Sequence, residues 1–397
     1  RIREVFVVAQ VALALVLLAA AGLMVRSMSR LAAVQPGFDP RGALSMELPL
    51  SRARYRTYDD VAAFSRALLA ALQGIPGVKV AGIGSGVPLL GMDGCAVAYA
   101  EGQAVEANAE PPCVGNALVS EGFLEALGVQ VRGRGMSWGD VDGLNGSVVV
   151  SRELAERFWP GEDPIGRGIR PNGHSPPYYR VVGVIEGLRA VGLERAPVEV
   201  VLYPIKPIPG AQLWQPLYTP SLVIRTNGVD PMSIVPQVRQ VVAGLDRQVP
   251  LTGIRTMESI VRDSVAWSRF IMLLLGVAAG MAILLSAVGL YGVISYLVTQ
   301  RRSEIGVRMA LGARASQVSG QVIRESLQLA LTGVAIGLAA AFVVNRLLSV
   351  FLFETAPYDP LTLGVTSVSL IGVAALASAL PARRAALVAP IEVLRDG

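Results

Sequence analysis

Charged residues are scarce in this chain of 397 residues. They make up 16% of the sequence, whereas charged residues account for about 25% of soluble globular domains. Hydrophobic residues make up 52% of the chain, and its mean hydropathy is +0.51. This composition excludes an ordinary soluble protein and predicts an integral membrane protein.

Histidine and lysine are nearly absent, which removes several kinds of chemistry. His174 is the only histidine, so the chain has almost none of the histidines that a histidine-based catalytic triad or zinc site requires. The only lysines, Lys79 and Lys206, follow Val78 and Ile205 instead of the glycine that precedes the lysine of a Walker A loop. The chain therefore cannot be the ATPase of a transport system. We expect no catalytic residue, no cofactor and no metal bound by this chain.

Long hydrophobic runs, in contrast, are present at both ends of the chain. Each of four uncharged stretches reaches the length of about 20 residues that crosses roughly 30 Å of hydrocarbon. They cover residues 5–25, 270–300, 326–345 and 360–382. The first is longer than the apolar region of a signal peptide, so we interpret it as an uncleaved span. The predicted fold class is an α-helical membrane protein of four spans, with a large α+β domain inserted between the first and the second.

The distribution of charge predicts the orientation of these spans. Basic residues gather before the first span, in the 301–325 loop and in the tail 383–397. By the positive-inside rule, both termini and this loop are cytoplasmic and the large domain is extracytoplasmic. The large domain itself is close to neutral, so the net charge of +5 is not that of a nucleic-acid-binding surface. We expect membrane lipid as a partner and no nucleic acid.

The extracytoplasmic domain, 31–256, alternates strand and helix patterns. Two strand–helix–strand units predict a split βαβ subdomain, formed by 43–93 and 221–256, around a β-rich insertion at 94–220. The first span then occupies 1–30. From 257 onward the pattern stays helical without a break into the second span, which predicts a rigid stalk. The predicted elements are strands 43–50, 78–84, 221–226 and 249–254 and helices 58–72 and 231–245.

Three segments resemble known permeases. The segment 148–169, which includes Ala-Glu-Arg-Phe-Trp-Pro-Gly-Glu-Asp-Pro-Ile-Gly, and the strand 179–185 resemble the periplasmic core domain of MacB-type permeases. The segment 300–313, Gln-Arg-Arg-Ser-Glu-Ile-Gly-Val-Arg-Met-Ala-Leu-Gly-Ala, resembles the cytoplasmic loop of the FtsX-like permease domain, predicted here at 257–397. The tail, with Pro-Ile-Glu-Val-Leu-Arg at 390–395, resembles the end of that domain.

This resemblance implies the permease subunit of an ABC transporter of the mechanotransmission type. ATP would be hydrolysed on a partner cytoplasmic ATPase, and the periplasmic domain would move to export or extract an unknown substrate. Expected partners at the bacterial inner membrane are this ATPase, a second permease half in a homodimer or pseudo-dimer, and a periplasmic protein. The start of the chain is also similar to the second repeat of long duplicated permeases, so we expect the second half of a longer protein. The alternative function is a membrane-anchored periplasmic receptor or scaffold without ATP-driven transport.

A coupling helix is predicted at 301–312. Ile305 and Met309 share one face, and Glu304 lies four residues before Arg308, the spacing of an ion pair on a helix. The resemblance implies that these residues, with Leu311, contact the ATPase. The alternative is an amphipathic helix that lies on anionic lipid.

Two further pairs complete the candidate sites. Gly276 and Gly280 form a small-x-x-x-small pair, which allows close packing against another helix, here of a second permease half. The alternative is that glycines are simply common in such helices.

Cys95 and Cys113 are the only cysteines, and their predicted extracytoplasmic place favours a disulfide over two buried free thiols. A bridge that closes a loop of about 18 residues would stabilise the domain by about 3 kcal/mol.

Overall fold

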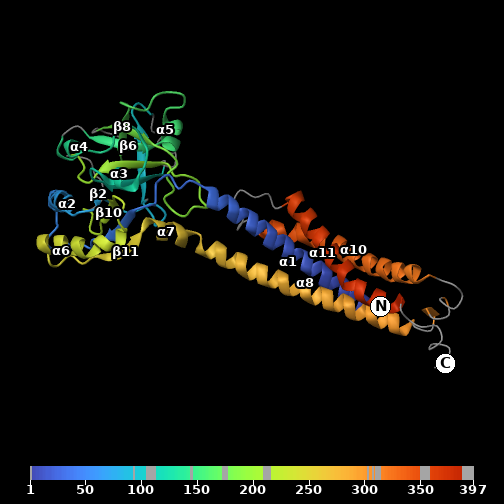
Figure 1. Ribbon diagram of the computed structural model, residues 1–397. Helices are drawn as coiled ribbons and strands as arrows, with labels where there is room; N and C mark the ends of the chain where they lie inside the picture. Colours follow the sequence, from blue (N-terminus) through green and yellow to red (C-terminus); the bar gives the residue numbers. More distant parts are fainter. Residues whose placement is uncertain are drawn as a thin grey trace. The chain divides into compact units, whose positions relative to one another are not determined.

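The computed structural model separates into two compact units (Figure 1). The membrane unit is formed by 1–33 and 266–397, and the external unit by 34–265. The structure describes residues 2–92, 94–103, 113–143, 146–171, 178–208, 216–301, 304–305, 308, 314–348 and 358–386.

Four long helices form the membrane unit. They are α1 (Ile2–Ala33), α8 (Ala266–Gln300), α10 (Ala315–Leu348) and α11 (Pro360–Ala386). Each contains one predicted uncharged stretch, and among the described residues these four are long and apolar enough to cross a membrane. The four predicted spans are therefore confirmed as helices of sufficient length.

Helix α1 contacts the other three membrane helices. Its inward face is made of small and branched apolar residues such as Val7, Ala14 and Leu15, all almost fully buried. Within the most apolar window of each helix, 39% of α1 is buried against 11% of α8. Helix α1 therefore holds the unit together, whereas α8 leaves most of its apolar surface free for lipid or another chain.

The external unit contains the predicted split βαβ arrangement. Strand β1 (Ala43–Glu47), helix α2 (Tyr58–Leu72) and strand β2 (Val78–Gly84) form one half. Strand β10 (Ser221–Thr226), a 3₁₀ turn at Pro231–Ile234, helix α6 (Val235–Leu245) and strand β11 (Thr252–Thr256) form the other. The sheet order is β11-β1-β10-β2 with every neighbouring pair antiparallel, so the two halves interleave.

Helix α2 covers this part of the sheet. Thr57 and Asp60 form a capping box at its start, where each side chain accepts a hydrogen bond from the backbone N–H of the other residue. Its inward face, including Leu68 and Leu72, is fully buried with Leu44 and Met46 of β1 in one hydrophobic core. The regularly spaced apolar residues that predicted this helix thus form the face that it buries.

The inserted segment extends the same sheet. Its strand β4 joins β2 through the pair Gly84↔Val119, so one sheet contains eleven described strands. The insertion still has a hydrophobic core of its own, with Val148, Tyr179 and Tyr203 fully buried. Its elements are β3 (Gly94–Ala100), β4 (Cys113–Val119), α3 (Phe123–Leu127), β5 (Val131–Gly133), α4 (Trp138–Asp142), β6 (Ser147–Ser151), α5 (Arg152–Phe158), β7 (Gly168–Pro171), β8 (Tyr179–Ile185) and β9 (Val200–Pro204).

A buried carboxylate fixes the turn before α4. The side chain of Asp140 is 7% exposed and accepts two hydrogen bonds from Arg134, at 2.6 and 2.7 Å, and further bonds from the backbone N–H and hydroxyl of Ser137. Burial acts to raise the pKa of Asp140, but the hydrogen bonds from Arg134 and Ser137 outweigh it and hold the pKa well below its ordinary value. The ionised carboxylate therefore stabilises this part of the external unit.

The predicted uninterrupted stalk helix is wrong at one residue. Helix α7 (Met257–Ser264) ends at Val265, which has φ −104° and ψ 2°, and α8 begins at Ala266. Helix α7 belongs to the external unit, where Met257 and Ile260 are almost fully buried. A helical pattern of apolar residues is insensitive to a single residue that leaves helical geometry, so the sequence did not show this break.

Candidate functional site

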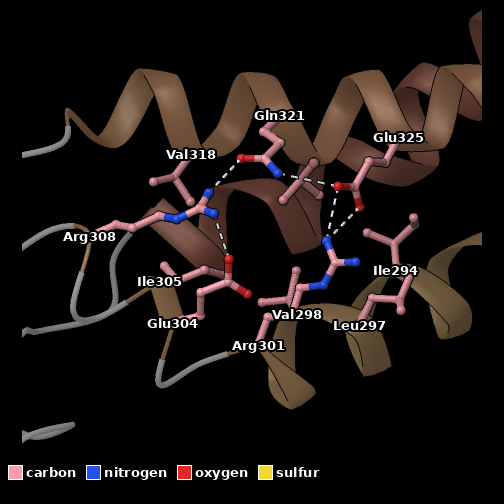
Figure 2. A pocket seen from close by; sticks show the side chains of 11 residues that line it. Ile294, Leu297, Val298, Arg301, Glu304, Ile305, Arg308, Val318, Gln321 and Glu325 are labelled. Atoms are coloured by element: carbon pink, nitrogen blue, oxygen red, sulfur yellow. Dashed lines mark hydrogen bonds and ion pairs between the residues drawn. The ribbon is translucent and has the colours of Figure 1, made fainter.

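A groove lies between the end of α8 and the start of α10, next to the predicted coupling segment (Figure 2). It is a shallow opening that is partly open to solvent. Apolar side chains, among them Leu297, Val298, Val318 and Val322, line it together with charged and amide groups from both helices and from the coupling segment.

Ile305 anchors the coupling segment to α10. Its side chain is 9% exposed and forms a small hydrophobic cluster with Val318, against which Val298 and Val322 also pack. Burying an isoleucine side chain stabilises a contact by about 1.5–3 kcal/mol. Among the described residues of the segment, this apolar contact is therefore the main attachment to the helices.

A chain of polar contacts follows the rim of the groove (Figure 2). Arg308 donates to Glu304 at 2.6 Å and to the side-chain oxygen of Gln321 at 3.2 Å. Gln321 in turn donates to Glu325 at 3.3 Å, and Arg301 donates to both oxygens of Glu325 at 3.0 and 3.3 Å. Two arginines and two glutamates thus balance each other across the rim.

These ion pairs set the orientation of the segment but contribute little to its stability. The side chains of Glu304 and Arg308 are 53% and 52% exposed, and that of Arg301 is 48% exposed. Solvent-exposed ion pairs of this kind typically contribute about 0–1 kcal/mol. Because the two carboxylates already neutralise the two arginines, the rim is less basic than the sequence of the loop suggests.

The predicted coupling residues differ in their exposure in the structure. The i, i+4 ion pair of Glu304 and Arg308 is confirmed. Ile305, predicted to present its side chain to a partner, instead packs inside the chain, because Val318 lies within reach on α10. Met309 and Leu311 lie outside the described residues, as does His174. Among the described residues of this segment, the half-exposed pair Glu304 and Arg308 is available to a partner, and their role toward an ATPase stays a prediction.

The predicted glycine pair lies on an open surface. No described side chain or distant backbone atom comes within 4 Å of a Cβ added at Gly276 or Gly280. Close helix packing within the chain involves another pair, Gly333 and Gly337 of α10, where an added Cβ would approach atoms of α1 to 2.7 and 3.0 Å. The Gly-x-x-x-Gly spacing of 333–337 carried the same signal in the sequence and was missed. Contact of Gly276 and Gly280 with a second permease half stays a prediction.

The cysteine pair lies on neighbouring strands. In the ladder between β3 and β4, Cys95 is opposite Gly115 and Cys113 is opposite Val97, so the two cysteines are diagonal neighbours. The side chain of Cys95 lies outside the described residues. The disulfide stays a prediction, now with a register that places the two backbones on adjacent strands.

An ion pair at the other end of the membrane unit was not predicted. Arg26 of α1 pairs with Asp359, which also accepts a hydrogen bond at 3.0 Å from the backbone N–H of Thr362 in the first turn of α11. The hydrogen bonds from Thr362 and Arg26 hold the pKa of Asp359 below its ordinary value. The carboxylate of Asp359 thus balances the charge of Arg26, which follows the uncharged stretch of α1.

Four apolar helices and a compact α+β unit inserted after the first of them define a multi-pass membrane protein of the permease type. The model of the MacB-like periplasmic core domain matches residues 5–241, and that of the FtsX-like permease C-terminal domain matches residues 276–389. The chain belongs to this family of MacB-like ABC transporter permeases, whose members work with ABC ATPases.

Named relatives agree with this assignment. The chain is 36% identical over 141 residues to the macrolide export ATP-binding/permease protein MacB of Chromobacterium violaceum, covering 35% of this chain and 22% of that protein. It is 27% identical over 284 residues to the probable syringafactin export ATP-binding/permease protein SyfD of Pseudomonas syringae pv. tomato, covering 70% of this chain and 41% of that protein. The chain thus spans less than half the length of these relatives.

Among solved structures, the periplasmic region of MacB from Actinobacillus actinomycetemcomitans matches 60% of this chain and 97% of that one. The sequence identity is 11% and the TM-score is 0.38, a level at which the match adds nothing to the assignment.

Proposed function

We propose that this chain is a permease of the mechanotransmission type, which converts ATP hydrolysis on a partner cytoplasmic ATPase into movement of the external unit. The chain has no Walker A lysine, so the energy has to come from a domain or subunit other than the one described here. The names of the relatives pair ATP binding with a permease, which supports this division of labour.

The observation that carries the proposal is the attachment of the coupling segment. Ile305 is buried against α10, and Arg308 and Arg301 are bonded to Gln321 and Glu325 of the same helix. A force applied to the exposed pair Glu304 and Arg308 would therefore reach α10. Helix α10 packs closely on α1 through Gly333 and Gly337, and α1 leads in the chain directly to the external unit.

In this proposal the protein lies in the inner membrane with the coupling segment in the cytoplasm and the external unit in the periplasm. The basic residues that flank the cytoplasmic ends of the helices support this orientation. Two copies, or two homologous halves, would pack through the open glycine face of α8. The substrate is one that is exported or extracted by movement of the external unit.

Charge reversal at the coupling segment tests the proposal. The full chain is reconstituted in nanodiscs with a partner ABC ATPase, and ATP hydrolysis is measured for Arg308→Glu, Glu304→Arg and the double reversal. The double reversal keeps the internal ion pair but inverts the charges that face a partner. We expect all three variants to lose most of the permease-dependent change in hydrolysis.

The control is Arg180→Glu, an exposed arginine of the external unit that pairs with Glu101. This variant also reverses the charge of an exposed, ion-paired arginine, but at a position far from the coupling segment in the sequence. We expect it to leave hydrolysis unchanged. Wild-type hydrolysis in all three coupling variants would contradict the proposal. Failure of any ATPase to bind the chain would favour the receptor or scaffold instead.

A further inference from the structure

The segment that leads from α1 into the external unit lies tightly against its neighbours. Residues 34–42, which we call the entry segment, connect the end of α1 to the start of β1 and belong to the external unit. The backbone oxygen of Pro36 accepts a hydrogen bond of 3.3 Å from the backbone N–H of Arg189. Gly37 has φ +86°, and a Cβ added there would come within 2.5 Å of the backbone oxygen of Gly187. The entry segment is therefore held in place although it forms neither a helix nor a strand.

One buried arginine fastens the entry segment to the sheet. Arg225 lies on β10, and its side chain is 12% exposed. Its Nη1 donates to the backbone oxygen of Arg41 at 2.8 Å, and its Nη2 donates to that of Asp39 at 2.7 Å. Its Nε donates at 3.0 Å to the backbone oxygen of Ala126 in α3. The planar guanidinium thus bonds three carbonyl groups, two of which belong to the entry segment.

The surroundings of this guanidinium leave space for it and for little else. A Cβ added at Gly128, which follows α3, would come within 2.7 Å of Nη2 of Arg225 and within 3.0 Å of Cβ of Asp39. The backbone N–H of Asp39 also donates at 3.0 Å to the backbone oxygen of Leu127 in α3. Arg225 therefore joins the entry segment and α3 to the strand that carries it.

The chain leaves the external unit close to the entry segment. Strand β11 leads into α7, and the sheet order β11-β1-β10 places β1 between the strand of the exit and the strand of Arg225. The carboxylate of Asp39 and, more weakly, that of Glu258 in α7 raise the pKa of Arg41. The side chain of Arg41 thus lies near α7. Both connections of the unit to the membrane helices therefore begin on adjacent strands, next to the strand of Arg225.

We propose that Arg225 is the positioning residue that transmits movement of α1 to the external sheet. This inference rests on the function proposed above. A pull on the entry segment would separate the segment from the sheet before it moved the sheet, unless the segment were fastened. The three bonds of Arg225 resist that separation, because opening them leaves carbonyl groups and a buried guanidinium unsatisfied. Lysine keeps the charge but lacks the planar fork that reaches three carbonyl groups.

Hydrogen exchange of the full chain in nanodiscs, without nucleotide or ATPase, tests the fastening. Peptides that cover 36–42 are compared in wild type, Arg225→Met and Arg225→Lys. We expect exchange about tenfold faster in Arg225→Met, because charge-assisted bonds are lost, and a smaller increase in Arg225→Lys. Strand β2 should keep the wild-type rate in both variants. If β2 also exchanges faster in Arg225→Met, that variant unfolds the unit, and Arg225→Lys decides the outcome.

The matched control is Arg255→Lys on β11. The side chain of Arg255 is 51% exposed and pairs with Asp263 at 3.8 Å, so the same substitution is made on a neighbouring strand without a buried network. We expect wild-type exchange of 36–42 in this control. Wild-type exchange of 36–42 in Arg225→Lys as well would overturn the proposal.

A movement assay separates a positioning role from a purely structural one. A dye on p-acetylphenylalanine at the exposed position 239 of α6 transfers energy to acceptor-labelled lipid headgroups, with a partner ABC ATPase present. We expect Arg225→Lys to keep wild-type ATP hydrolysis but to lose most of the ATP-dependent change in energy transfer. An undiminished change in this variant would overturn the proposal. No change in wild type would count against the function proposed above, and hydrogen exchange would then decide whether Arg225 fastens the entry segment.

Discussion

Truncation of Ile305 should release the coupling segment without unfolding the membrane unit. Removing buried methyl groups costs about 2–5 kcal/mol when an isoleucine becomes alanine. The cost at Ile305 falls at the low end, about 2 kcal/mol, because the side chain is 9% exposed and packs in a cluster with few members. The ion pairs on the rim are half-exposed and do not compensate for this loss.

This magnitude predicts a measurable change in hydrogen exchange. If the segment opens locally, a loss of about 2 kcal/mol lowers the protection of its amides about 30-fold, since 1.4 kcal/mol corresponds to a factor of ten. Hydrogen exchange of peptides that span 298–308 is measured in nanodiscs for Ile305→Ala and for the milder Ile305→Val. The milder variant should lose about 0.5–1.5 kcal/mol and give an intermediate change.

The control is Val343→Ala on α10, whose side chain is 62% exposed and whose truncation removes little buried surface. It should leave exchange in 298–308 at the wild-type rate. Equal protection in Ile305→Ala and wild type would refute the anchoring role. Faster exchange across all four membrane helices would show instead that the contact supports the whole unit.

Four further predictions concern other parts of the molecule. Gly333→Leu should separate α10 from α1 and lower the thermal stability of the protein in detergent, because its side chain has no room against α1. Gly280→Leu should leave that stability unchanged but weaken cysteine crosslinking between two permease copies; unchanged crosslinking would count against an α8 interface. Asp140→Asn should reduce the free energy of unfolding of the external unit by about 2 kcal/mol at neutral pH. Because the folded-state pKa of this carboxyl is depressed, its contribution is present above the ordinary value near 4 and is lost as the pH falls below it, so wild type and variant should converge in acid. Finally, thiol labelling of the denatured, unreduced protein from its native membrane should modify neither Cys95 nor Cys113, and two labelled cysteines per chain would exclude the disulfide.

Several parts of the fold were predictable because they depend on local composition. Helix α2 was visible in the apolar spacing of 58–72, because these apolar residues form the face that α2 buries in the core. The boundaries were less predictable: the strand predicted at 43–50 ends at Glu47, although Leu48 and Leu50 continue to bond Pro220 and Tyr218 through the backbone. Such ends are decided by the partner strand, which lies far away in the sequence.

The candidate site was predictable in position but not in contacts. The i, i+4 spacing of Glu304 and Arg308 is enough to predict their ion pair, since it depends only on one turn of helix. The burial of Ile305 is different, because an amphipathic pattern shows that an apolar face exists and not which surface covers it. Val318, thirteen positions later on another helix, covers it here.

The sequence by itself determined the class of this protein and its order of segments. Stretches of about 20 uncharged residues have a strong preference for hydrocarbon whatever they pack against, so four spans and an inserted domain follow from composition alone. The tertiary structure decided which side chains remain available. It buries Ile305, exposes Glu304 and Arg308, packs Gly333 on α1 and leaves Gly280 open. These outcomes depend on contacts between helices that are distant in the chain. Residues 276–280 and 333–337 share the same Gly-x-x-x-Gly spacing, so the local pattern alone does not tell which pair packs on another helix of the chain.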